Sequence, residues 1–300
     1  MTRLGKSDVQ RGVRLQDRDF HIIRELGIVI WMSTDTIHSR HFPDDRTGES
    51  ARRRLRLFAR HGLIESFDLH ITSAGKTGRS PRFHRLTEYG AEVLRDFTGV
   101  AAPRVMKGSP PKPHTIQHRA GMGETLLSFS DACNKKQLPE SEWFLEYDTR
   151  ATSRPNALFH ERFKICDEVT DSSGRRCRVW PDALSTLNVP HNGSVAQLAI
   201  AWEYDRATET LTQITEKLDP YLIWLNDKRY RDHFPDARDL RICLVVPSHR
   251  RMQSLIAATR DHRIAAFLRF VSVTDFTPDR ILDAPIWYTT GGDAKRILPS

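Results

Sequence analysis

Residues 49–60 read ESARRRLRLFAR and are the most informative stretch of the chain. The apolar members recur at helical spacing and form one stripe, namely Ala51, Leu55, Phe58 and Ala59. Four arginines fall on another face, namely Arg52, Arg53, Arg56 and Arg60. The pattern predicts a helix over 49–61 that packs one face on a core and exposes a strongly basic one.

The sequence on either side of this helix completes a small domain. Before it, 15–27 predicts a first helix that stops at a glycine, and 33–43 predicts a short second helix. After it, two β-prone runs flank the tract TSAGKTGRSP, which predicts a hairpin with Lys76, Arg79 and Arg82 at its tip. Three helices and a basic hairpin, followed by a fourth helix over 87–97, predict a winged helix-turn-helix domain over 1–98.

The charge distribution supports a polyanionic partner for this domain. Residues 1–120 hold 22 Lys and Arg against 13 Asp and Glu, whereas residues 121–300 hold 24 against 25, so the net +8 arises entirely in the first part. We therefore expect double-stranded DNA as the partner, with the third helix in the major groove and the hairpin on the backbone. A module for protein contacts is the alternative, but five arginines in nine residues favour phosphate.

A second domain follows a linker. Residues 99–113 carry four prolines, two glycines and no acid, and are predicted as the linker. Over 114–300 the order of predicted elements is α-β-β-β-α-β-α, which implies a mixed sheet flanked by helices and an α+β or α/β fold. One long strand is expected over 175–189, a second over 195–205, and a long helix over 208–225 that is bent or paused at Pro220.

Three carboxylates are predicted on two neighbouring strands of the second domain. Asp182 is predicted on the strand over 175–189, and Glu203 and Asp205 share one face of the strand over 195–205. Adjacent antiparallel strands bring such side chains close together, and clustered carboxylate oxygens suit Mg²⁺ or Mn²⁺. Glu124 on the preceding helix is a further candidate, and no other cofactor is indicated.

Pro181-Asp182 followed by Glu203-Tyr204-Asp205 resembles the PD-(D/E)XK restriction-endonuclease-like superfamily. The resemblance implies a metal ion that activates water to attack a DNA phosphodiester. The superfamily motif ends in lysine, whereas Asp205 stands there in this chain, with Arg206 beside it and Lys217 along the following helix. Either Lys217 has taken the place of the motif lysine, or the domain has kept the fold and lost catalysis. The missing lysine slightly favours the inactive form.

The chain as a whole also resembles the replication-relaxation family of plasmids and other mobile elements. The resemblance is carried by RDFHIIRELG, RRRLRLFARHGLI, WPDAL, WEYDRATETLTQITEKLDPYLIW, LRICLVVP and APIWY. It implies a bacterial DNA-binding protein that acts in plasmid replication, transfer or their regulation, without a firmly assigned chemistry.

The sequence is therefore compatible with three functions. The first is a DNA-binding protein of a mobile element, and the second is a Mg²⁺- or Mn²⁺-dependent DNA endonuclease guided by the winged helix. The third is an assembly protein for a replication or relaxase complex, with other plasmid replication or transfer proteins as its partners. Because two-fold operators match two-fold proteins, a homodimer is expected. The first 20 residues and the rest of the chain lack a long apolar run, so we expect a cytoplasmic protein without a membrane partner.

Overall fold

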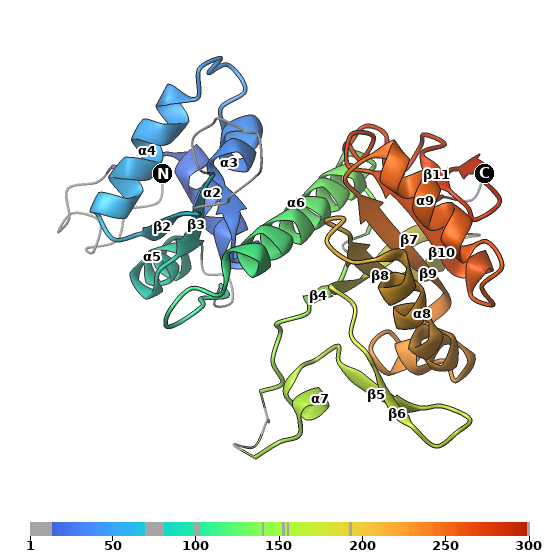
Figure 1. The fold of residues 1–300 in the computed structure, drawn as a ribbon. Coiled ribbons are helices and arrows are strands. Elements are labelled where there is room, and N and C mark those ends of the chain that lie inside the picture. The colour runs from blue at the N-terminus through green and yellow to red at the C-terminus, as the bar shows by residue number, and fades with distance from the viewer. Residues whose placement is uncertain are drawn as a thin grey trace. The chain divides into compact units, whose positions relative to one another are not determined.

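A computed structural model describes residues 14–69, 81–98, 103–139, 141–151, 154, 156–191 and 194–298. The chain divides by its internal contacts into an N-terminal unit, Met1–Leu127, and a C-terminal unit, Ser128–Ser300 (Figure 1). The boundary falls inside one helix, α6 (Pro113–Lys135). The domain boundaries predicted from the sequence, at 98 and 113, thus differ from the boundary between the two compact units, at Leu127. Which segments fold independently stays a prediction.

The N-terminal unit has the order helix, strand, helix, helix, strand, strand, helix. Its elements are α2 (Asp17–Val29), β1 (Met32–Ser33), α3 (Thr34–His41), α4 (Glu49–Arg60), β2 (Ile64–Asp68), β3 (Arg82–Leu86) and α5 (Glu88–Thr98). The three strands form an antiparallel sheet in the order β1-β3-β2. The predicted hairpin is confirmed, since Ile64 pairs with Leu86 and Asp68 with Arg82.

Helix α2 continues past the glycine that was expected to end it. A Cβ atom on Gly27 would lie 2.4 Å from the Cβ of Pro103, and the Arg104 backbone N–H donates to the Gly27 carbonyl at 2.7 Å. The glycine therefore serves the close approach of the 103–104 segment, and the helix runs on to Val29. Part of the predicted linker is packed on the N-terminal unit.

The C-terminal unit is built on a seven-stranded mixed sheet in the order β12-β11-β10-β9-β8-β7-β4. Strands β4, β7 and β8 are antiparallel, β8, β9 and β10 are parallel, and β11 and β12 return antiparallel. The sheet is formed by β4 (Trp143–Leu145), β7 (Ala183–His191), β8 (Ser194–Tyr204), β9 (Ala237–Val246), β10 (Leu268–Ser272), β11 (Trp287–Tyr288) and β12 (Ala294–Lys295). The expected mixed sheet with helices is confirmed, and the fold is α+β.

The helices and a smaller hairpin surround this sheet. They are α7 (Phe159–Arg162), β5 (Asp167–Thr170), β6 (Arg176–Val179), α8 (Leu211–Asn226), α9 (His249–Thr259) and the 3₁₀ turns at Arg229–Asp232 and Ala265–Phe267. Helices α8 and α9 pack on one face, where Leu218 and Leu255 join the core formed by Leu184 and Ile242 (Figure 1). On the other face Trp202 meets Phe129 of α6, with ring centroids 5.1 Å apart.

The long strand expected over 175–189 is two strands. Residues 176–179 form β6 and pair with β5 as a separate two-stranded sheet, whereas β7 begins at Ala183 and pairs with β4 and β8. Asp182 therefore lies just before β7, at the break between two sheets, and not within a continuous strand. None of the helices in the described part of the chain combines the length and apolar character needed to cross a bilayer.

Candidate functional site

Helix α4 has the amphipathic character that its sequence predicts. Ala51, Leu55 and Phe58 are buried, while Arg53 and Arg60 are exposed. The helix begins after Gly48, which has a φ of 69°, a left-handed conformation that glycine adopts without strain. The carboxylate of Asp45 accepts from the first backbone N–H groups of the helix, at 2.7 Å from Ser50.

Arg54, which the sequence pattern assigned to neither face, is structural. Its guanidinium forms a two-pronged ion pair with Asp19 of α2, with 2.9 Å between Nε and Oδ1. The Asp19 side chain is completely buried, and the Gln16 backbone N–H also donates to it at 2.7 Å. This pair fixes α4 against the beginning of α2, so the basic face of α4 has a defined orientation within the unit.

A groove of about 420 Å³ runs beside α4. Five arginines lie along it, namely Arg18, Arg53, Arg54, Arg56 and Arg60, and no acidic side chain lines it among the described residues. Arg18 is held over the ring of Phe42, with its guanidinium carbon 4.1 Å from the ring centroid. Arg53 and Arg60 have no ion-pair partner within the described ranges. Such a groove favours a polyanion.

The other predicted basic residues that the structure describes have acidic neighbours. Glu49 pairs with both Arg56 (2.7 Å) and Arg52 (3.3 Å), and these hydrogen bonds, chiefly that of Arg56, lower the pKa of Glu49. Arg82 is the first residue of β3, pairs with Asp68 of β2 and donates to its carboxylate at 2.8 Å, so it lies in the strand ladder and not at the tip. Lys76 and Arg79 lie outside the described residues, and their part in DNA binding stays a prediction.

These three arginines meet at a second hollow. Arg52 and Arg56 of α4 and Arg82 of β3 line a cavity of about 360 Å³, together with Thr34, His84 and one acid, Asp35. The His84 ring is buried between the hydroxyl groups of Thr34 and Ser66, each at 2.9 Å, and burial lowers its pKa to about 3. The exposed ion pairs of Arg52 and Arg56 stabilise the fold little, so both arginines can exchange a carboxylate for a phosphate at small cost.

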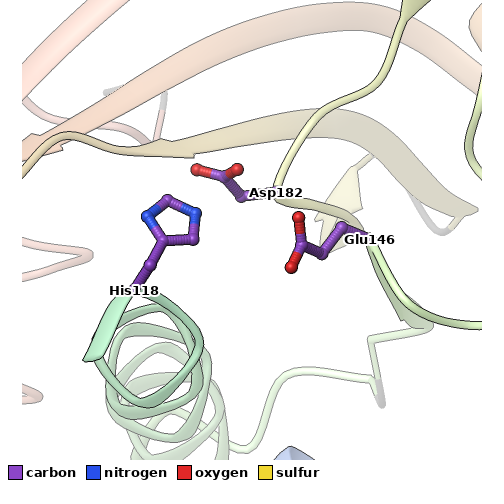
Figure 2. A group of neighbouring side chains, drawn as sticks. All are labelled: His118, Glu146 and Asp182. Carbon is purple, nitrogen blue, oxygen red and sulfur yellow. The ribbon is translucent and has the colours of Figure 1, made fainter. Parts of the chain in front are cut away.

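The C-terminal unit holds the predicted carboxylates. Asp182 is buried, and its Oδ2 accepts from the backbone N–H of Tyr204 at 2.7 Å, which ties it to the end of β8. Figure 2 shows Asp182 beside Glu146, whose backbone N–H donates to the Asp182 carbonyl at 2.9 Å. One carboxylate oxygen of each lies within 4.8 Å of the other. The third residue drawn there, His118, lies in the part of α6 that belongs to the N-terminal unit.

Glu203 extends from β8 toward α8. The Lys217 ammonium and the Tyr221 hydroxyl, one helical turn apart on α8, both donate to its carboxylate. Burial raises the pKa of Glu203 to about 7, with a further increase from the negative charge of Asp182, against the opposing effect of Lys217. The structure thus joins Asp182, Glu203 and Lys217 in one electrostatic cluster, with the lysine supplied by the helix.

Asp205 and Glu124 are engaged elsewhere. Asp205 pairs with Arg251 of α9 at 2.6 Å and accepts from the Ala207 backbone N–H at 2.7 Å. Among the described residues, no hydrogen bond or ion pair connects Asp205 to Asp182 or Glu203. Glu124 accepts from the hydroxyl of Thr36 at 3.1 Å, within the N-terminal unit. The expected metal ligand Asp205 is therefore neutralised by an arginine.

The donor chemistry of the remaining cluster suits a hard divalent cation. Asp182 and Glu146 present carboxylate oxygens at adjacent positions, and Glu203 is the third acid nearby. Sequence reasoning missed Glu146, Tyr221 and Arg251. The helical spacing of Lys217 and Tyr221 would have placed them on one face of α8, but nothing local to the sequence links Arg251 to Asp205 across 46 positions.

Protonation of Glu203 is expected to change the stability of the fold. Because the pKa of Glu203 rises from an ordinary value of 4.5 to about 7 on folding, its stabilising contribution is complete below about pH 4.5 and is lost as the pH rises through about 7. Between these values we expect the free energy of unfolding of the wild type to fall by about 3 kcal/mol relative to Glu203→Gln. Urea unfolding in EDTA at several pH values measures this. A pH-independent difference would contradict it.

Comparison with known proteins identifies one family. The family model described as replication-relaxation matches residues 22–235, which is more than half of the chain. The matched range includes α4 and the cluster of Asp182, Glu203 and Lys217. Neither the curated proteins nor the solved structures provide a match. On the extent of this match, the chain belongs to the replication-relaxation family.

Proposed function

We propose that the protein is a double-stranded-DNA-binding protein of a plasmid or other mobile element, acting in its replication, its transfer or their regulation. The element order of the N-terminal unit supports this proposal, since it is compatible with a winged helix-turn-helix, in which α4 would be the helix that enters the major groove. Family membership supports the link to replication.

The observation that carries the proposal is the groove of five arginines beside α4. A DNA backbone places phosphates at regular intervals, and guanidinium groups bind them through charge and paired N–H donors. Arg18, Arg53 and Arg60 lie along this groove beside α4. Such a surface positions a helix on duplex DNA, and the side chains of α4 that reach the base edges supply sequence preference.

Duplex binding by the full chain tests this function. Each arginine that replaces a counterion on a phosphate contributes about −0.9 to the slope of log K against log salt, so several contacts give a slope of roughly −4 to −8. Fluorescence anisotropy with a labelled duplex at four or more salt concentrations measures it. A flat salt dependence would contradict binding through this surface.

A second candidate, a metal-dependent DNA endonuclease, is favoured by one specific contact. Lys217 of α8 contacts Glu203, and it would take the place of the lysine that the PD-(D/E)XK-like pattern lacks at position 205. Asp182 and Glu146 would hold a Mg²⁺ or Mn²⁺ ion, which in such sites lowers the pKa of a water molecule that attacks phosphorus. Tyr221 and Lys217 keep the Glu203 carboxylate in place.

A bound cation is expected to stabilise the protein by linkage. At a Mn²⁺ concentration about 100 times the dissociation constant, binding raises the free energy of unfolding by about 2.7 kcal/mol. This corresponds to an increase of roughly 5 °C or more in the melting temperature. Asp182→Ala should remove the increase, and Asp171→Asn, in the turn of the β5–β6 hairpin, should retain it. Nicking of supercoiled plasmid that requires metal and is lost in Glu203→Ala would establish cleavage. An unchanged melting temperature in Mn²⁺ would exclude the metal site.

A further inference from the structure

An insertion separates two strands that lie side by side in the large sheet. Strands β4 and β7 pair directly, yet residues 146–182 stand between them in sequence and hold α7, β5 and β6. Figure 1 shows this segment set apart from the large sheet and next to α8. Its two strands form their own sheet, so its surface is not required to complete the main one.

Three aromatic rings gather on this insertion. Phe159 of α7 lies 4.8 Å from Trp180 and 5.1 Å from Phe163, and Phe163 lies 5.0 Å from Trp180, all between ring centroids. Phe159 remains 37% exposed and its neighbour Leu158 57% exposed. The Arg178 guanidinium carbon lies 4.9 Å from the centroid of the Phe159 ring. An exposed ring beside an arginine is the arrangement on which a nucleic-acid base stacks.

Exposed cations lie along the same insertion. The set comprises Arg150, Arg154, Arg162, Arg178 and Lys164, and the Lys164 ammonium lies 5.1 Å from the centroid of the Phe144 ring, outside the three-ring cluster. Within the described ranges none of them forms an ion pair with an acidic side chain. Arg150 donates instead to the carbonyls of Phe163 and Lys164, at 3.0 and 3.2 Å, and Arg162 to that of Ala157, at 2.9 Å. These charges remain available for phosphate groups.

The innermost ring of the cluster is attached to the carboxylate site. The Trp180 indole N–H donates to the Glu146 carbonyl at 3.0 Å, and Trp180 lies two positions before Asp182. The carboxylates of Glu146 and Asp182 approach within 4.8 Å. A nucleic-acid strand bound on the rings would therefore lie on the same segment of the chain that carries the Glu146 and Asp182 carboxylates.

We propose that this insertion binds an unpaired DNA strand, with a base stacked on Phe159 and the exposed cations of the insertion on the phosphates. Paired bases are stacked on one another inside a duplex and cannot reach the ring, so the rings select single-stranded over double-stranded DNA. The inference rests on the proposed function, because it takes DNA as the bound polymer. It goes beyond that function in stating that the C-terminal unit binds single-stranded DNA.

The test compares two ligands with one full-length protein. A labelled single strand of about 16 nucleotides without self-complementarity, and the matching duplex, are titrated by fluorescence anisotropy. Phe159→Leu keeps an apolar side chain but removes the π face, and it should weaken single-strand binding about fivefold or more while leaving duplex binding unchanged. Phe159→Trp should restore single-strand binding.

Arg176→Ala is the matched control, because Arg176 lies on the same hairpin but pairs with Glu168 at 3.4 Å. It should bind both ligands as the wild type does. Should Phe159→Leu fail to fold, Arg178→Gln serves as the second variant, with the same selective loss expected. Wild-type affinity of these variants for the single strand, or an equal loss for both ligands, would overturn the proposal. If the wild type does not bind duplex DNA but the variants still lose single-strand binding, the single-strand proposal stands and the proposed function is refuted.

Discussion

Arg54→Ala is expected to lower the free energy of unfolding of the N-terminal unit by about 3 kcal/mol. Removing this guanidinium leaves the completely buried Asp19 carboxylate without its counterion, and an uncompensated buried charge is costly. The remaining hydrogen bond from the Gln16 N–H and the partial exposure of Arg54, 18% of its side chain, keep the effect at the lower end of the range for buried pairs.

Hydrogen exchange of the full chain locates this loss of stability. Protection of the amides of α2 and α4 should fall together in Arg54→Ala, because the pair joins these two helices. Arg53→Ala is the matched control, since Arg53 is exposed on the same helix and its replacement should change stability by no more than about 0.5 kcal/mol. Equal protection in the two variants would show that the pair does not hold the helices.

The strongest periodic pattern gave the most accurate prediction. Helix α4 was expected over 49–61 and spans Glu49–Arg60, because a stripe of apolar residues among arginines can be buried in only one way. The end of α2 was wrong for a physical reason: Gly27 was interpreted as a stop signal, but it accommodates Pro103. A glycine that permits close approach and one that ends a helix have the same sequence signature.

Strand partners could not be deduced from one sequence. The run over 175–189 was expected as one strand across Pro181, yet β6 pairs with β5 and β7 with β4 and β8, so the strand is interrupted just before Asp182. Pairing partners are a tertiary choice that local pattern does not record. This break places Asp182 at a strand end, where its side chain meets Glu146 (Figure 2).

The carboxylate cluster was predicted only in part. Asp182 and Glu203 were expected together from strand adjacency, and their charges do interact. Spacing alone could suggest Lys217 but could not decide it, because the contact depends on how α8 packs on the sheet. Asp205 has the right alternation to join the cluster, and it is Arg251 of α9, distant in sequence, that holds it elsewhere.

The double variant Arg53→Ala/Arg60→Ala is expected to bind duplex DNA about 30-fold more weakly than the wild type at 0.15 M salt. Both side chains are exposed on α4, line the same groove and have no ion-pair partner among the described residues, so their charge is available for phosphate. Each lost phosphate contact removes about 0.9 released counterion, a factor of about 5 at this salt concentration. The salt slope should become less steep by about 2.

The affinity of this double variant for duplex DNA tests the central claim, that α4 is the DNA-binding helix. Its control is Arg175→Ala/Arg176→Ala, which removes the same charge from a hairpin of the C-terminal unit where both arginines pair with acids. A loss of about 30-fold with the reduced slope, against less than about twofold in the control, is the predicted result. Equal losses in the two variants would contradict the claim and place the duplex-binding surface elsewhere.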